Sequence, residues 1–169
     1  MEHIMNSSQK SKAKAISMRL VSSVMQLDIF STRIMQRYTF VLLRFSLAII
    51  FFWFGILKPF GLSPANELIA NTVFFLPSEY FIPILGWWEV AIGVLMLFRP
   101  TVKYALILLF LQIPGTFLPL LLLPEVTFTE FPYGLTLEGQ YIIKNLTLIA
   151  AAIAVGGTID REKKDNELL

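Results

Sequence analysis

The chain contains no cysteine and only one histidine among its 169 residues. Without cysteine it can form neither a disulfide nor an iron–sulfur cluster or metal site held by its own thiolates. The single histidine, His3, lies in a polar leader, where we expect it to be solvated. A haem held by two histidines of this chain is therefore excluded, and the sequence predicts no covalently bound cofactor and no metal site.

Charge is also scarce. Only 15% of the residues are charged, whereas 56% are hydrophobic, and the mean hydropathy is +0.67. This balance lies outside the range of ordinary soluble domains and indicates an integral membrane protein with one domain. The net charge of +2 gives no indication of nucleic-acid binding.

Four apolar runs have the length that a helix needs to cross the hydrocarbon core, about 20 residues. They cover about residues 38–57, 80–98, 102–123 and 139–157. The third run contains Pro114 and Pro119, which predict kinks. The predicted fold is therefore all-α, an integral membrane four-helix bundle over residues 38–157.

The segments outside the bundle are short. Residues 1–37 predict a basic amphipathic helix on the membrane surface, with a disordered basic leader as the alternative, and residues 158–169 form a charged tail. The loop 59–79 predicts a short helix over residues 64–71, capped by Ser63. The loop 124–138 has three glutamates and no basic residue.

Lysines and arginines predict the orientation. Eleven of them lie in the leader, the 99–103 turn and the tail, whereas the two opposite loops contain only Lys58. The positive-inside rule then predicts a multi-pass chain with both termini in the cytoplasm and both longer loops on the opposite side of the membrane. Lys58 and Trp53 are expected at the far interface, where an indole and a long ammonium side chain are both well solvated.

Glu89 lies near the middle of the second apolar run. A charge at the centre of a span costs at least ~2.5–3.5 kcal/mol and normally faces a bundle interior, a wet cavity or a partner charge. Arg44 and Lys144, in the first and fourth runs, are the predicted partners. On a rise of ~1.5 Å per residue the three follow one another across the membrane at offsets of ~5–8 Å, which long side chains can bridge.

Two interpretations of this charge network remain open. In one, Glu89 and a base form a buried ion pair that fixes helix register without any ligand. In the other, Arg44, Lys144 and Gln112 bind an anionic or carbonyl-bearing small molecule, and Glu89 holds or relays a proton. The candidate ligand-binding or network residues are Arg44, Glu89, Lys144, Gln112, Asn145, Trp53 and Trp88. Trp87 or Trp88, deeper than the interfacial Trp53, is the better candidate for stacking on a flat ring such as a quinone, and adjacent residues on a helix cannot both face the same way.

Three stretches resemble the DoxX-like membrane proteins, particularly their YkgB-type branch. They are the first-run segment from Arg44 to Lys58, the segment Glu89–Gly93, and Phe131-Pro132-Tyr133 with the later residues 142–146. The likeness covers about residues 38–157. It implies a four-helix bacterial inner-membrane protein associated with quinone-linked oxidoreductases or with oxidative stress. It supplies no catalytic residue.

The leading hypothesis is an accessory or quinone-interacting subunit of a membrane oxidoreductase, with the bilayer, an oxidoreductase partner subunit or a second copy as partners. Because the chain has no redox-metal ligands, electrons would come from a partner or a diffusible carrier. Whether it is an enzyme in its own right stays open. The alternatives are a structural or scaffold subunit with no ligand site and a small transporter.

Overall fold

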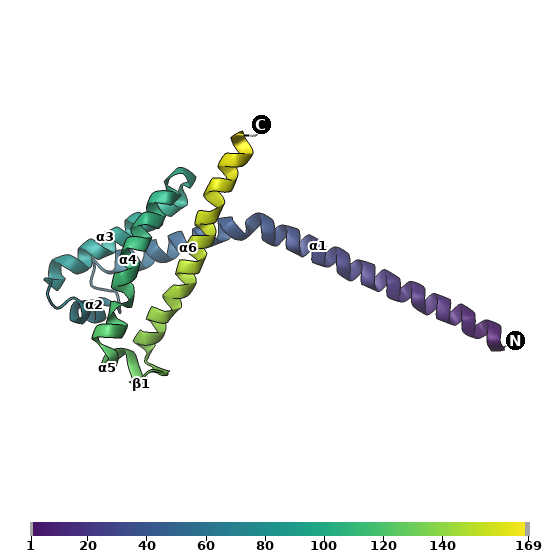
Figure 1. The fold of residues 1–169 in the computed structure, drawn as a ribbon, viewed down its shortest axis with the longest axis horizontal. Coiled ribbons are helices and arrows are strands. Elements are labelled where there is room, and N and C mark those ends of the chain that lie inside the picture. Colours follow the sequence, from purple (N-terminus) through teal and green to yellow (C-terminus); the bar gives the residue numbers. More distant parts are fainter. Residues whose placement is uncertain (1, 168–169) are drawn as a thin grey trace. The chain divides into compact units, whose positions relative to one another are not determined.

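The computed structural model describes the backbone of residues 2–167 and the side chains of residues 18, 25, 26 and 28–158. It divides into two compact units, residues 1–39 and residues 40–169, which are described separately below. One helix, α1 (Glu2–Leu57), contributes to both units (Figure 1).

The first unit consists of the N-terminal part of α1. The leader is helical from Glu2 and is not separated from the apolar run by a break. Its side chains before Met18 lie outside the described residues, and those described are exposed, Met25 and Phe30 among them. The amphipathic, surface-bound arrangement of this segment therefore stays a prediction.

The described residues are mostly helical, and they contain four helical segments that are long and apolar enough to cross a membrane: Asp28–Leu57 of α1, which belongs to both units, and Ser78–Leu97, Arg99–Leu122 and Leu137–Thr158 of the second unit. These are, in order, the end of α1, helix α3 (Ser78–Leu97), α4 (Val102–Leu122) with the 3-10 turn Arg99–Thr101 before it, and most of α6 (Leu137–Glu167). The four predicted apolar spans all correspond to observed helices, which indicates a multi-pass membrane protein.

Very little apolar surface is buried inside the second unit. The buried core is small and includes Leu47 and Ala48 of α1, Ile92 and Met96 of α3, Ala105 and Leu109 of α4, and Ala152 and Val155 of α6. Large apolar side chains on the same helices are exposed, for example Ile49, Ile84 and Leu111, at 59%, 63% and 64%. In a water-soluble bundle this outer surface would be polar, so it fits contact with lipid.

Glycines bring α1 and α3 into close antiparallel contact. A Cβ atom on Gly55 would lie 2.7 Å from the backbone nitrogen of Val90, and one on Gly93 would lie 2.6 Å from that of Phe52. Small residues allow helix backbones to approach in a membrane, where packing is a main source of helix association. The register of α1 on α3 is therefore fixed by backbone contact.

Helix α1 ends within this contact. Its last turn closes with two backbone hydrogen bonds, Gly61 N–H to the Lys58 carbonyl at 3.1 Å and Leu62 N–H to the Leu57 carbonyl at 3.0 Å. Gly61 has a φ of 71°, as the left-handed residue of a Schellman motif requires. The end of α1 packs on Gly86, whose Cβ would lie 2.6 Å from Pro59. The helix therefore ends beside the middle of α3 and not beside its start.

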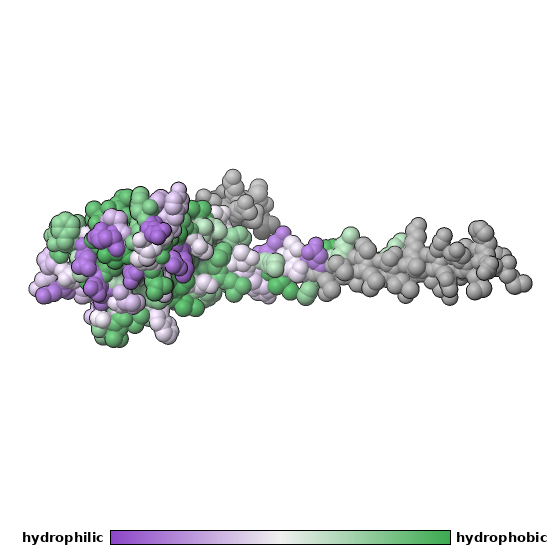
Figure 2. Space-filling view, turned by 90° about the horizontal axis from the view of Figure 1, so that it is seen from below, coloured by the Kyte–Doolittle hydropathy of each residue, from purple (hydrophilic) through white to green (hydrophobic). Residues whose placement is uncertain are grey.

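Short elements cover the other end of the bundle. Helix α2 (Asn66–Thr72), close to the predicted helix 64–71, packs against α3 and α4. After α4, the loop forms the helical turn α5 (Pro124–Thr127) and an antiparallel pair, β1 (Phe128–Glu130) with β2 (Gly134–Leu135). Figure 2, which views the molecule from below, shows hydrophilic side chains gathered over part of the second unit and hydrophobic ones beside them.

Candidate functional site

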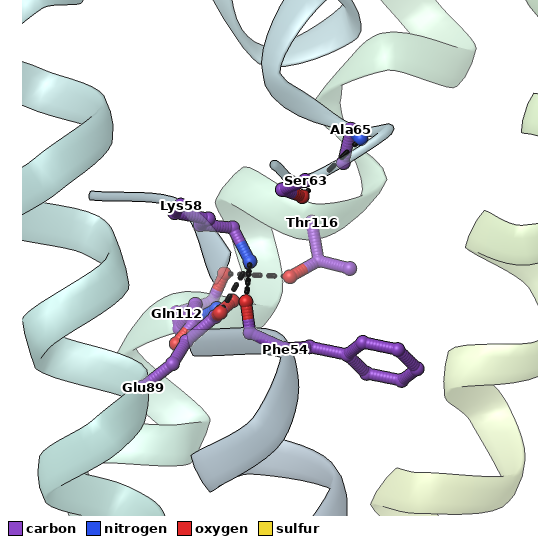
Figure 3. A network of polar contacts seen from close by, with 7 residues as sticks. All are labelled: Phe54, Lys58, Ser63, Ala65, Glu89, Gln112 and Thr116. Carbon is purple, nitrogen blue, oxygen red and sulfur yellow. Dashed lines mark hydrogen bonds and ion pairs between the residues drawn. The ribbon is translucent and has the colours of Figure 1, made fainter. Parts of the chain in front are cut away.

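A buried polar cluster joins three helices of the second unit (Figure 3). The Lys58 ammonium forms an ion pair with Oε2 of Glu89. On the other side, Nε2 of Gln112 donates a hydrogen bond to Oε1 of Glu89 at 2.6 Å. Lys58 is 7% exposed and Glu89 8%, so the charges are almost wholly removed from the surface. Each carboxylate oxygen thus has one donor.

Each member of the cluster is positioned by a different local feature. Lys58 directly follows the last residue of α1, and its ammonium also donates to the Phe54 carbonyl at 3.4 Å. Glu89 lies in the middle of α3, between the glycines that contact α1. Gln112 lies near the middle of α4. The cluster therefore depends on the relative register of all three helices.

The cluster has hydrogen-bonding capacity that its own members do not use. Oε1 of Gln112 is buried and has no hydrogen-bond partner among the described residues. An ammonium has three donors, and those of Lys58 are directed to only two acceptors, one of them distant. A buried polar atom without a partner costs free energy unless water or a ligand satisfies it. The cluster can therefore offer a donor and an acceptor to a small polar molecule.

Hydroxyl groups lie next to the cluster on the side of the α1–α2 connection. Figure 3 shows Ser63 and Thr116 beyond the Lys58 ammonium, on the loop and on α4 respectively. The Ser63 hydroxyl accepts the Ala65 N–H at 3.3 Å, and the Thr116 hydroxyl donates to the Gln112 carbonyl at 3.2 Å. Polar groups thus continue from the cluster toward the end of the bundle that α2 covers.

The predicted ladder of Arg44, Glu89 and Lys144 is not formed among the described residues, because Glu89 pairs with Lys58 instead. Gly93 of α3 packs between Ala48 and Phe52 of α1. On a rise of ~1.5 Å per residue, Arg44 is then about level with the turn that joins α3 to α4. It therefore lies near one end of the bundle and not one-third of the way into it.

Lys144 and Asn145 lie away from the cluster on α6. Lys144 is exposed, and its ammonium lies 5.2 Å from the centre of the Tyr141 ring. Asn145 donates from Nδ2 to the Tyr141 carbonyl one turn earlier, at 3.1 Å. The structure therefore gives both residues local partners on their own helix.

The tryptophans separate into exposed and partly buried residues. Trp53 is 63% exposed and Trp87 55%. Trp88 is partly buried against the core and donates from Nε1 to the Leu108 carbonyl at 3.2 Å. Of the three, Trp88, next to Glu89 in the sequence, packs inside the bundle.

The expectation that the Lys58 ammonium is solvated is wrong. The side chain is buried and ion-paired in the bundle because α1 ends beside the middle of α3. The sequence alone could have located the end of α1. Pro59 has no backbone N–H to continue the helix, and Gly61 permits a Schellman turn. The depth of that end relative to Glu89 depends on contacts that no local pattern shows.

No family model matches the chain, and neither a curated protein nor a solved structure matches it. The resemblance to DoxX-like proteins thus remains a hypothesis. The described residues also contain no group of three or more histidine, aspartate or glutamate side chains that could hold a metal ion. The site is defined by its geometry alone.

Proposed function

We propose that the chain is a multi-pass protein of the bacterial inner membrane that binds a quinone head group at the Lys58–Glu89–Gln112 cluster, as an accessory subunit of a membrane oxidoreductase or oxidative-stress system. The observation that carries this proposal is the buried Lys58–Glu89 ion pair, hydrogen-bonded to Gln112 inside an apolar four-helix unit, with an amide oxygen of Gln112 that has no hydrogen-bond partner among the described residues. Intramembrane ionisable residues commonly mark functional sites.

A quinone carbonyl only accepts hydrogen bonds, so the Lys58 ammonium suits the oxidised ring, whereas Oε1 of Gln112 suits a hydroxyl of the reduced quinol. A lysine N–H can donate to a ring carbonyl, and the indole of Trp88 lies on the same helix as Glu89, beside the core. Glu89 keeps the ammonium in place through the ion pair. A bound quinone would supply the redox chemistry. The chain's own contribution is to bind and orient the ring.

Co-purification and binding test this function. The full chain is purified in mild detergent from its native membrane, and the organic extract is examined by mass spectrometry for quinones. Binding of duroquinone is then measured by equilibrium dialysis against protein-free micelles. We expect binding by the native chain, a loss of about tenfold or more in Lys58→Met because a charge-assisted hydrogen bond is removed, and no change in Lys144→Met. Absence of any quinone affinity in the native chain would refute the proposal.

A purely structural role is the second candidate, and the ion pair supports it. Lys58 and Glu89 neutralise each other at the point where glycines hold α1 against α3. In that case the native chain binds no small molecule, and Lys58→Met changes only the stability of the fold. A scaffold that recruits a soluble enzyme would also lose partner recovery in pull-downs when residues 1–36 are deleted. Unchanged recovery would count against a scaffold.

The proposed orientation places both termini and the α3–α4 turn in the cytoplasm. The absence of cysteine makes this testable by introducing one cysteine at a time. Thr129→Cys in the β1 strand and Lys103→Cys at the start of α4 are both at exposed positions. A membrane-impermeant maleimide should label only the Thr129 variant in intact spheroplasts and both variants after lysis. Labelling of the Lys103 variant alone in spheroplasts would reverse the orientation.

A further inference from the structure

Arg44 is a cation on the packed side of α1 that has no carboxylate partner among the described residues. It lies three, four and seven residues before Leu47, Ala48 and Phe51, and so shares their helix face. Its Nε is buried and makes no hydrogen bond, and the guanidinium carbon lies 5.4 Å from the centre of the Phe45 ring. The Arg44 guanidinium thus has a buried N–H donor that is not used in a hydrogen bond among the described residues.

The described acidic residues of the second unit lie elsewhere. Within residues 40–158, Glu89 is engaged by Lys58 and Gln112. The other five are on α2, at the start of α3 and on the segment from α5 to the start of α6: Glu67, Glu79, Glu125, Glu130 and Glu138. All five belong to the end of the bundle opposite the α3–α4 turn. Arg44 is about level with the α3–α4 turn. None of the carboxylates of residues 40–158 lies near that turn.

More positive charge lies at the same end. Lys103, one residue into α4, is exposed, and its ammonium lies 4.9 Å from the centre of the Tyr104 ring. The positive end of the dipole of α4, a helix of 21 residues, lies at this end as well. Two side-chain cations and a helix start thus favour an anion there.

The surrounding surface indicates where the anion comes from. Exposed apolar side chains flank this end, including Leu42, Phe45 and Leu97, at 63%, 42% and 40%. A guanidinium binds phosphate oxygens in pairs through its planar fork, and basic residues at a bilayer surface attract anionic lipids. We propose that Arg44 binds the head-group phosphate of an anionic phospholipid at the α3–α4 end of the bundle, and that Lys103 adds positive charge at the same end.

Lipid binding to the purified full chain tests this proposal. Delipidated protein in a non-ionic detergent is titrated with dioleoyl phosphatidylglycerol or dioleoyl phosphatidylcholine, and the bound lipid is counted by native mass spectrometry. We expect tighter binding of the phosphatidylglycerol. Arg44→Leu should weaken it about tenfold or more, since charge-assisted hydrogen bonds are lost, and Lys103→Met should weaken it less. Lys144→Met removes a cation from the first half of α6, at the other end of the bundle, and should leave the affinity for phosphatidylglycerol unchanged.

Three outcomes would overturn the proposal. They are equal affinity for the two lipids, unchanged affinity in Arg44→Leu, and displacement of the lipid by millimolar inorganic phosphate, which would assign the site to a soluble anion. If Arg44→Leu does not fold, Arg44→Lys is used instead. It keeps the positive charge but cannot form the two parallel hydrogen bonds of a guanidinium to a phosphate. It should then bind the phosphatidylglycerol more weakly than the native chain, and equal binding would refute the guanidinium contact.

Discussion

Replacement of Gly93 by alanine should loosen the contact between α1 and α3. The added Cβ would lie 2.6 Å from the Phe52 nitrogen and 2.8 Å from the Ala48 carbonyl oxygen. Both are backbone atoms, so no side-chain rotation can relieve the clash. Because ordinary contact begins at 3.4 Å, the helices must separate by roughly 0.8 Å at this level.

The cost follows from that separation. A gap of ~0.5–1 Å forfeits about a quarter to a half of the dispersion energy of each contact that it opens. Overpacking of a well-packed interface costs about 1–3 kcal/mol. Packing is a main source of helix association in lipid, so we expect Gly93→Ala to lower the free energy of unfolding by about 1–3 kcal/mol.

Gly115→Ala is the matched control. Gly115 lies inside α4, and a Cβ there would meet no atom within 4 Å. Its replacement should be neutral or should stabilise the helix by up to about 1 kcal/mol. Unfolding by dodecyl sulfate in mixed micelles, followed by circular dichroism, measures both variants. Equal stability of Gly93→Ala and Gly115→Ala would refute the close contact between α1 and α3.

Two further predictions concern the polar groups. Lys58→Met should lower the free energy of unfolding by about 3–5 kcal/mol because it leaves the Glu89 carboxylate buried without its counter-ion. The double variant Lys58→Met with Glu89→Gln should recover most of that loss. The same dodecyl sulfate titration measures this, and strictly additive effects of the two single variants would contradict the ion pair. Trp88→Phe should cost about 0.5–1.5 kcal/mol because the hydrogen bond to the Leu108 carbonyl is lost, whereas Trp87→Phe, at an exposed position, should not. Equal thermal stability of these two variants would show that the indole N–H contributes nothing.

The existence of the four helices follows from the sequence alone. A run of about 20 apolar residues crosses the bilayer as a helix because lipid offers no partner to backbone N–H and carbonyl groups. The interior position of Glu89 followed for the same reason, since a charge in an apolar run must face away from lipid. Gln112 was also among the predicted residues, and it contacts Glu89 as a neutral donor.

The partner of Glu89 was decided only by the tertiary structure. Counting residues from the ends of each apolar run assumes that every helix starts and ends at the membrane surface. Helix α1 instead ends at a Schellman turn that packs beside Gly86, and so brings Lys58 to Glu89 while Arg44 lies level with the α3–α4 turn. Composition sets which segments enter the bilayer, but the relative depth of two helices depends on backbone contacts between residues distant in the chain, and these contacts choose which charges meet.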